Sequence, residues 1–239
     1  PYPTIAGYHQ KPTVVNNVET LANVPQIILN GPDWFRSIGT KRCPGTKVYT
    51  MLGDVNITGL VETPMGTTLR EIIEIYGGGM KNGKTFKCAQ TGGASGSIIP
   101  AEMLDVPMDF ASMSEKGAAL GSGALLVCGE DTCIVDLAYV LERFFKTESC
   151  GKCVPCRVGT AQMLESLERL RRGYGTQIDL DRLEEAAEFA SEASFCGLGQ
   201  AAPVPIITGL RYFREEFEAH ARGECPTGAC PMDRPLKRD

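Results

Sequence analysis

Four cysteines constrain this chain more than any other feature. Cys150, Cys153 and Cys156 are each separated by two residues, and Cys196 follows forty residues after the third. Two intervening residues let consecutive sulfurs converge on one point, so these thiolates can take three corners of a cubane and Cys196 the fourth. The pattern therefore predicts a [4Fe–4S] site and a redox activity. A structural zinc site is the main alternative, although such sites usually pair two Cys-x2-Cys knuckles, and a chance cluster of thiols is the other.

The composition restricts the class of protein. The chain has 239 residues, 43% hydrophobic and 22% charged, as expected of a globular protein with one large domain or two small ones. Its formal net charge of -5 gives no electrostatic basis for binding nucleic acid or anionic membrane. No apolar run reaches the ~18 residues needed to span a bilayer, and the first residues lack the features of a signal peptide. Clustered cysteines without such a signal favour metal ligation in a reducing compartment, the cytoplasm.

The residue pattern predicts an α+β chain. Residues 1–43 are rich in Pro and Asn, contain one helix over 18–30, and suggest a piece of a longer polypeptide. Residues 44–127 form a β-grasp-like module and its connection. Its predicted elements are strands over 47–53, 57–62 and 85–90, a helix over 67–76 behind a threonine cap, and a short buried strand over 124–128.

A helical bundle is predicted over residues 128–222, because four helical segments follow one another with short connections. They cover residues 132–146, 160–173, a segment capped by Asp179 or Asp181 and running to 193, and 205–218. Residues 223–239 form a metal-binding tail or linker. No Ser-His-Asp or Cys-His nucleophile set is present, so no catalytic residue is assigned.

A second group of metal ligands lies near the C-terminus. Cys225 and Cys230 follow His220 by a few residues, and Cys133 stands at the start of the first bundle helix. Three cysteines and one histidine make a tetrahedral zinc set, which needs no redox chemistry and would join the tail to the bundle. Two alternatives stay open, namely that Cys225 and Cys230 begin a ferredoxin-like cluster domain, or that the thiols are free. Cys128 is the substitute ligand if Cys133 is misplaced.

Three runs of sequence, over residues 11–23, 148–157 and 195–199, resemble the flavin-bearing, NADH-oxidising subunit of respiratory complex I. The diaphorase subunits of NAD-linked hydrogenases and formate dehydrogenases are similar to it as well. The resemblance implies a Rossmann-like domain that binds FMN and NADH, a β-grasp module of the soluble-ligand-binding type, and a helical bundle carrying one [4Fe–4S] cluster. In that family the glycine-rich segment that holds the flavin lies upstream of the first run. The chain therefore resembles the C-terminal portion only, and residues 1–43 would end the FMN domain.

The resemblance also assigns residues to the flavin. Asn16 and Asn17 would contact FMN or its phosphate, with Thr20 one helical turn beyond, while Gly197 and Leu198 would lie between the cluster and the flavin. Amide side chains and a helix N-terminus suit a phosphate or the polar edge of a flavin. The structural alternatives are capping of the helix by the two asparagines and a plain Gly-Leu-Gly turn.

The function implied by the resemblance is electron transfer within an NAD(H)-linked flavin and iron–sulfur oxidoreductase. Electrons would pass between FMN and the clusters of partners, among them a thioredoxin-like [2Fe–2S] subunit and a cluster-rich catalytic subunit. The second ligand group favours a hydrogenase or formate dehydrogenase diaphorase, including an electron-bifurcating one, over the NADH dehydrogenase subunit of complex I. The alternative of another class is a non-catalytic, cluster-bearing relay that docks partners. Without the upstream domain the chain is expected to bind FMN and NADH poorly and to be inactive with NADH by itself.

Overall fold

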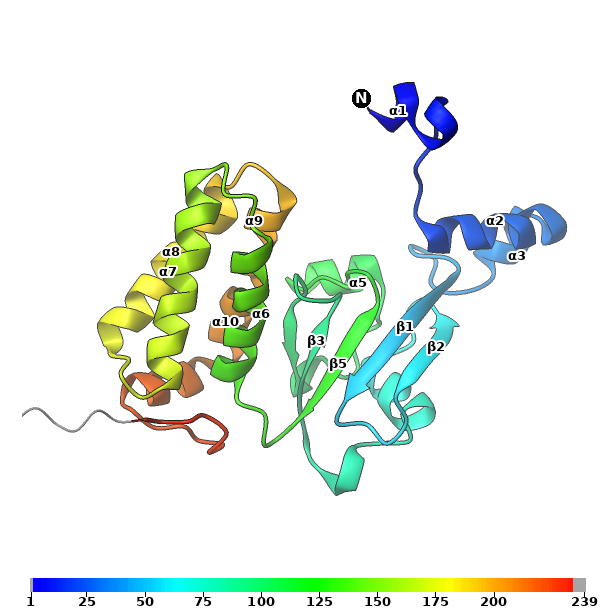
Figure 1. Ribbon diagram of the computed structural model, residues 1–239. Helices are drawn as coiled ribbons and strands as arrows, with labels where there is room; N and C mark the ends of the chain where they lie inside the picture. The colour runs from blue at the N-terminus through cyan, green and yellow to red at the C-terminus, as the bar shows by residue number, and fades with distance from the viewer. Residues whose placement is uncertain (1, 234–239) are drawn as a thin grey trace, which may run out of the picture.

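A five-stranded mixed sheet lies between N-terminal helices and a C-terminal helical bundle in the computed structural model, which describes residues 2–233 (Figure 1). The strands are β1 (Thr46–Gly53), β2 (Gly59–Pro64), β3 (Phe86–Thr91), β4 (Ile98–Pro100) and β5 (Ala124–Gly129). Their order is β2-β1-β5-β3-β4, and β5 pairs parallel with β1 and antiparallel with β3. The last strand in the sequence therefore lies in the middle of the sheet.

The two faces of the sheet pack against different layers, because successive side chains of a strand point to opposite sides. Cys88 and Cys128 point toward the bundle and share its hydrophobic core. Their neighbours Ala89 and Val127 belong to a second core on the other face. Short helical segments cover that second core: α4 (Leu69–Glu71) with the π-helical turn η2 (Ile72–Tyr76), η3 (Lys81–Gly83), η4 (Ala101–Met103) and α5 (Phe110–Glu115).

The bundle is joined to the sheet by core packing and by two polar contacts. Its helices are α6 (Ile134–Glu148), α7 (Val154–Arg171), α8 (Gln177–Ala193), the short α9 (Gly197–Ala201) and α10 (Val204–Ala221). The backbone N–H of Ile98 donates to Oγ1 of Thr208 on α10 at 3.0 Å. Lys87 on β3 forms an ion pair with Glu216 on α10 at 2.5 Å, and both side chains are largely buried. These contacts fix α10 against the sheet.

The N-terminal helices lie over one end of the sheet, and α1 projects away from it (Figure 1). They are α1 (Pro3–Ala6), the 3₁₀ turn η1 (Tyr8–Gln10), α2 (Val18–Asn30) and α3 (Pro32–Arg36). Glu19 holds α2 to β1, because its carboxylate accepts from the backbone N–H of Val48 at 2.9 Å and pairs with Lys47. Within residues 2–233, no helix combines the length and apolar character needed to cross a membrane.

Most predicted elements are present, with displaced ends. The helix predicted over 18–30 is α2 with the same bounds, and the strand predicted over 57–62 is β2, two residues later. The helix predicted to begin at 160 is α7, which begins at Val154 because proline is tolerated in the first turn of a helix. The predicted cap of α8 was wrong: Thr176 is the cap, and Asp179 accepts from its backbone N–H at 2.8 Å in a capping box. Neither β4 nor α5 was predicted.

The predicted domain boundaries stay predictions. Strand β5 runs across the boundary placed between residues 127 and 128. Residues 234–239 of the predicted tail or linker lie outside the described residues.

Candidate metal centres

The four cysteines predicted to hold the [4Fe–4S] cluster come from three segments of the bundle. Cys150 lies in the loop after α6, Cys153 and Cys156 lie at the start of α7, and Cys196 directly precedes α9. Ser149, the neighbour of Cys150, lies 3.2 Å from Cys156 Sγ, and Gly199, three residues after Cys196, packs against the Cβ of Cys156, so the three segments meet at Cys156. Burial raises the pKa of the Cys156 thiol, and the hydrogen bond with Ser149 opposes this rise. Convergence of four cysteines around one point is what a [4Fe–4S] cluster requires of its protein.

The backbone around Cys153 favours the thiolate form of its side chain. Backbone N–H groups of Phe195 and Cys156 donate to its sulfur, and Arg157 adds a positive charge, so the pKa of Cys153 is lowered. The guanidinium of Arg157 donates to the carbonyl of Gly151 at 2.5 Å. Arg157 therefore both fastens the loop between the first two cysteines and places its charge beside a candidate ligand.

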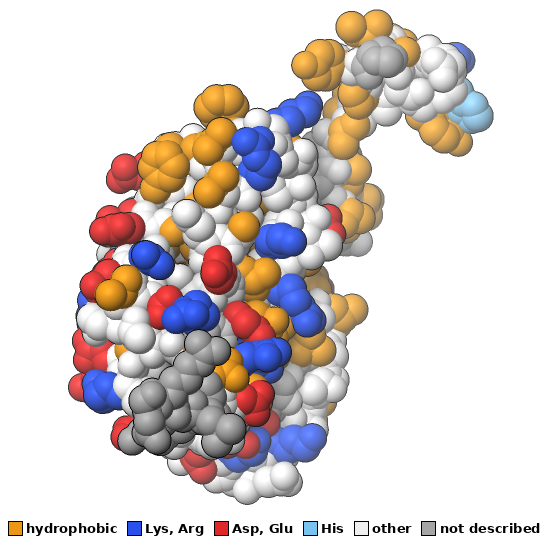
Figure 2. Space-filling model, turned by 60° about the vertical axis from the view of Figure 1, so that its left-hand side comes forward, with side chains coloured by type: hydrophobic (Ala, Val, Ile, Leu, Met, Phe, Trp, Pro, Cys, Tyr) orange, Lys and Arg blue, Asp and Glu red, His pale blue; other side chains and the backbone are white. Residues whose placement is uncertain are grey.

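The candidate cluster site is buried on one side and open on the other. Cys153 and Cys156 are buried, whereas Cys150 and Cys196 are exposed. Phe195 is 86% exposed beside them, and large apolar side chains such as Val154 are exposed nearby in the sequence. Figure 2 shows hydrophobic side chains gathered at the upper end of the bundle. This end is therefore suited to contact with another protein surface.

Gly197 and Leu198 lie in the first turn of α9, with Cys196 as its N-cap. The alternative of a plain Gly-Leu-Gly turn at residues 197–199 is therefore wrong, because these residues begin a short helix. Gly199, which was not predicted as a site residue, is buried between Ser194 and Cys156. A Cβ at position 199 would stand 2.6 Å from Ser194 Oγ and 2.8 Å from Cys156 Cβ. Glycine is required here because any side chain would push the cysteine or the serine away.

The start of α2 holds three of the residues predicted to contact the flavin, Asn16, Asn17 and Thr20. The structure does not bring this helix into contact with the four cysteines. The Asn17 side chain caps the helix, accepting from the backbone N–H of Glu19 at 2.8 Å and of Thr20 at 3.2 Å. Asn16 accepts from the backbone N–H of Asn17 at 2.8 Å. Asn17 therefore makes the capping contact considered as the structural alternative, and the flavin contact of these residues stays a prediction.

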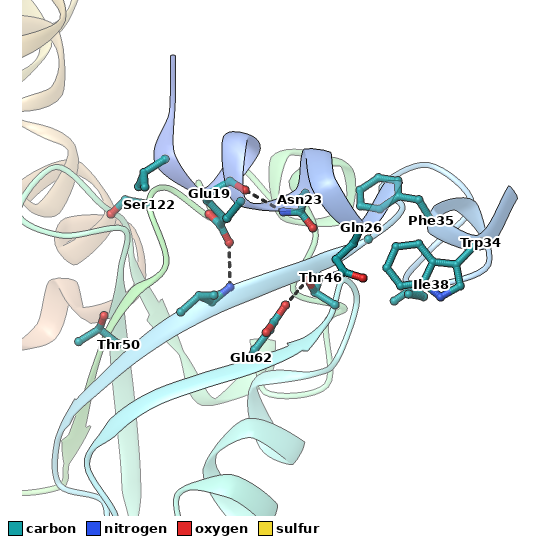
Figure 3. A pocket seen from close by; sticks show the side chains of 14 residues that line it. Glu19, Asn23, Gln26, Trp34, Phe35, Ile38, Thr46, Thr50, Glu62 and Ser122 are labelled. Atoms are coloured by element: carbon teal, nitrogen blue, oxygen red, sulfur yellow. Dashed lines mark hydrogen bonds between the residues drawn. The ribbon is translucent and has the colours of Figure 1, made fainter. Parts of the chain in front are cut away.

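A cavity of about 640 Å³ lies beside α2, between α2, α3 and the strands β1 and β2 (Figure 3). Trp34 and Phe35 supply much of its apolar lining. Its two carboxylates are already bound, since Glu62 accepts from Thr46 at 2.6 Å and Glu19 holds β1. The cavity therefore offers a shaped apolar surface but no free charged group, and we assign it no chemistry.

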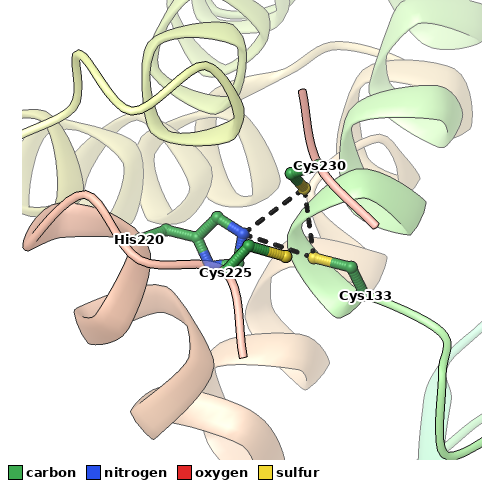
Figure 4. A group of neighbouring side chains, drawn as sticks. All are labelled: Cys133, His220, Cys225 and Cys230. Carbon is green, nitrogen blue, oxygen red and sulfur yellow. Dashed lines mark hydrogen bonds between the residues drawn. The ribbon is translucent and has the colours of Figure 1, made fainter. Parts of the chain in front are cut away.

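The structure brings Cys133, His220, Cys225 and Cys230 together, as the sequence predicted (Figure 4). The four ligand atoms all lie within 4.8 Å of one another. The distances between Cys133 Sγ, Cys230 Sγ and His220 Nε2 are each 3.4 Å. Ligands about 2.0–2.3 Å from a tetrahedral Zn²⁺ stand roughly 3.3–3.8 Å apart, so the arrangement fits a zinc ion.

The surroundings also fit a metal ligand set. His220 is fully buried, and its Nδ1 lies 2.7 Å from the carbonyl of Glu216, so the proton is held there and Nε2 faces the thiols. A hydrogen bond from Cys230 outweighs the effect of burial and, with the ring of His220, lowers the pKa of Cys133 to about 4. Burial lowers the pKa of His220, but the hydrogen bond and the charge of Cys133 raise it to about 9, so the ring is an imidazolium beside the Cys133 thiolate when no metal is bound. Zinc binds a thiolate and a neutral imidazole nitrogen, so its binding would displace the proton from Nε2.

Glu142 is a buried titratable group that the sequence analysis did not single out. It lies on the inner face of α6, is 1% exposed, and neither of its carboxylate oxygens has a hydrogen-bond partner among residues 2–233. Burial raises the pKa of Glu142 to about 9. The side chain is therefore a neutral acid in the folded protein at pH 7.

Substituting Glu142→Gln should remove a pH dependence of stability. Between pH 4.5 and about 9 the folded protein keeps a proton that the unfolded chain releases, so the folded state becomes less stable as the pH rises. Relative to the variant, the wild-type free energy of unfolding should fall by up to about 1.4 kcal/mol per pH unit in this window. Melting temperatures measured from pH 6 to 9 test this, with the exposed Glu192→Gln as control. Parallel wild-type and Glu142→Gln curves would contradict it.

Two family models match the chain. Residues 136–220 match the NADH-ubiquinone oxidoreductase-F iron-sulfur binding region, and residues 48–99 match the SLBB domain. The first match contains all four cysteines of the candidate cluster site. It ends at His220, so Cys133, Cys225 and Cys230 of the candidate zinc site lie outside it.

The chain is similar to known proteins along nearly its whole length. It is 46% identical over 231 residues to NADP-reducing hydrogenase subunit HndC of Solidesulfovibrio fructosivorans, covering 96% of this chain and 47% of that one. It is 42% identical over 233 residues to the NADH-quinone oxidoreductase F subunit of Mycobacterium tuberculosis, covering 98% and 51%. With the corresponding Escherichia coli protein the identity is 42% over 220 residues, covering 92% and 49%. The chain spans about half the length of these relatives.

A solved structure resembles the fold. The crystal structure of an NAD⁺-reducing [NiFe]-hydrogenase in the H₂-reduced state aligns with a TM-score of 0.80 and 38% sequence identity, covering 92% of this chain and 37% of the other. The air-oxidised state of that enzyme aligns equally well.

Proposed function

We propose that this chain is an electron-carrying part of an NAD(H)-linked oxidoreductase. It matches the iron–sulfur binding region and the SLBB domain, and its homologues are NADH-quinone oxidoreductase F subunits and the hydrogenase subunit HndC. The observation that carries the proposal is that the segments holding Cys150 and Cys196 pack against Cys156, through Ser149 and Gly199, within the matched iron–sulfur region. A [4Fe–4S] cluster at these four thiols would supply one-electron chemistry.

The residues around the four cysteines have separate roles in this proposal. Cys153 and Cys156 hold the buried side of the site, and Cys150 and Cys196 close it from the exposed side. Backbone N–H groups lower the pKa of Cys153 and so favour its thiolate, and Arg157 holds the loop that carries Gly151. Gly199 leaves the space that Cys156 needs. These groups position ligands and set the local charge, and we assign none of them a bond-making step.

We also propose that partners receive or deliver the electrons at the open end of the bundle. Exposure of Cys150 and Cys196 beside an apolar surface supports this, because electron transfer between proteins requires close approach of the two centres. The flavin contacts of Asn16, Asn17, Thr20, Gly197 and Leu198 belong to the same proposal, with FMN and NAD(H) as the redox partners of the complex. Their support is the resemblance to the flavin-bearing subunits.

The group Cys133, His220, Cys225 and Cys230 is proposed to bind zinc as a structural ion, which would tie the segment after α10 to the start of α6. The mutual distances and the burial of three of the four ligands support this.

Among the relatives, the similarity to HndC and to the NAD⁺-reducing hydrogenase supports a hydrogenase-type complex. The formate dehydrogenase relation, electron bifurcation and inactivity of the isolated chain stay predictions.

Metal analysis of the protein purified without oxygen tests the proposed function. We expect about four iron atoms and four acid-labile sulfides per chain, and an electron paramagnetic resonance (EPR) signal of a reduced [4Fe–4S] cluster after chemical reduction. One zinc per chain should be found in addition. Zinc without iron or sulfide would overturn the electron-carrying role, because no redox centre would remain at the four cysteines.

A further inference from the structure

Ser149, the C-cap residue of α6, lies directly against one of the candidate cluster ligands. Its Oγ stands 3.2 Å from Cys156 Sγ. The same oxygen accepts a hydrogen bond from the backbone N–H of Gly151 at 3.3 Å. Because a sulfur that ligates iron has no proton to give, the hydroxyl hydrogen of Ser149 is the one that can bridge the two atoms.

Ser194, the C-cap residue of α8, lies near the same cysteine. It is 4% exposed, and its hydroxyl has no hydrogen-bond partner within the part of the chain that the structure describes. Its Oγ and the Cβ of Cys156 both lie within 3 Å of the point where a side chain on Gly199 would begin. A buried hydroxyl without a partner destabilises the folded protein, so an acceptor at this place would relieve that cost.

We propose that Ser149 and Ser194 donate hydroxyl hydrogen bonds to sulfur at the Cys156 corner of the [4Fe–4S] cluster and thereby raise its reduction potential. The inference rests on the proposed function, since it needs the cluster at the four cysteines. For Ser149 the acceptor is Cys156 Sγ; for Ser194 it is that sulfur or a sulfide of the cluster beside it. Both serines are positioning residues, and neither takes part in a bond-making step.

The direction of the effect follows from charge. Reduction adds one electron to the cluster, so its sulfurs become more negative and hydrogen bonds to them become stronger. A donor therefore stabilises the reduced form more than the oxidised form. Burial of Ser194 increases this difference because water cannot replace the lost donor.

The experiment is a redox titration of the cluster followed by EPR, on the full chain with its iron and sulfide content measured first. At a fixed potential near the midpoint, Ser149→Ala and Ser194→Ala should each lower the ratio of reduced to oxidised cluster by roughly three- to tenfold. The double variant should lower it further. Ser149→Thr, which keeps a hydroxyl, should stay close to the wild-type ratio.

The matched control is Ser166→Ala, which removes another buried serine hydroxyl from α7, ten residues after Cys156 and about 15 Å along the helix. The proposal fails for a serine if its alanine variant keeps the full iron content and has the same ratio of reduced to oxidised cluster as the Ser166→Ala control. If an alanine variant does not retain its cluster, the threonine and valine variants of that serine are compared instead, since the two side chains have the same shape and only threonine keeps the hydroxyl. Equal ratios of reduced to oxidised cluster in the two variants would overturn the proposal for that serine. Absence of iron and sulfide in the wild type would instead refute the proposed function.

Discussion

Substitution of Cys153 by alanine is expected to destroy the [4Fe–4S] cluster. This thiol is the ligand most fixed by its surroundings, since it caps α7 and accepts backbone hydrogen bonds from Phe195 and Cys156. No other described cysteine can replace the missing ligand. Cys43 lies before β1, Cys88 and Cys128 lie in the sheet, and the remaining three belong to the candidate zinc site at the opposite end of α6. The iron content should fall from about four atoms per chain to three or fewer. The EPR signal of the reduced cluster should be lost with it.

Cys43→Ala provides the matched control for this prediction. Cys43 is also a free thiol and is half-buried, but it lies in the loop before β1, away from the bundle. It should keep four iron atoms and the wild-type signal. Zinc should stay at one per chain in both variants. Four iron atoms and an unchanged signal in Cys153→Ala would show that the ligand set is wrong.

The sequence predicted the order of the main elements because each long segment has its own signal. Helix α2 begins after an asparagine cap and ends at Asn30, directly before Gly31, and both ends were predicted correctly. The start of α7 was placed six residues late, because the apolar periodicity is weak where Cys153 and Cys156 face the candidate cluster. Strand β4 has only three residues, too few to show an alternation. The central place of β5 depends on pairing with β1 and β3, which no local pattern reports.

The candidate sites were predictable to the extent that their ligands are close in sequence. His220, Cys225 and Cys230 lie within eleven residues, and the spacing of Cys150, Cys153 and Cys156 is characteristic of a metal site. Ser194 and Glu142 gave no such signal. A serine at a helix end is common, and its relation to Cys156 exists only because Gly199 lets the two approach. Glu142 looks like any other charged residue of an amphipathic helix until its burial is known.

Replacement of His220 by alanine is expected to remove the zinc ion and to loosen the C-terminal segment. His220 Nε2 stands 3.4 Å from both Cys133 and Cys230, so its loss opens one corner of the site and leaves buried thiolates without a cation. Leaving buried charge uncompensated costs about 3–5 kcal/mol. For a protein of this size the melting temperature should fall by roughly 10 °C. Amide hydrogen exchange should increase in residues 223–233, which the site ties to the bundle.

The control is His9→Ala, since His9 is the only other histidine of the chain and is exposed. It should keep both zinc and stability. The iron content should not change in either variant, because the two sites lie at opposite ends of α6, whose 15 residues separate them by about 22 Å. Loss of iron in His220→Ala, or an unchanged melting temperature and zinc content, would contradict a separate structural zinc site. Retention of iron with loss of zinc would show instead that α6 connects two independent metal centres. One would be the cluster that carries electrons, and the other would be the zinc ion that stabilises the folded protein.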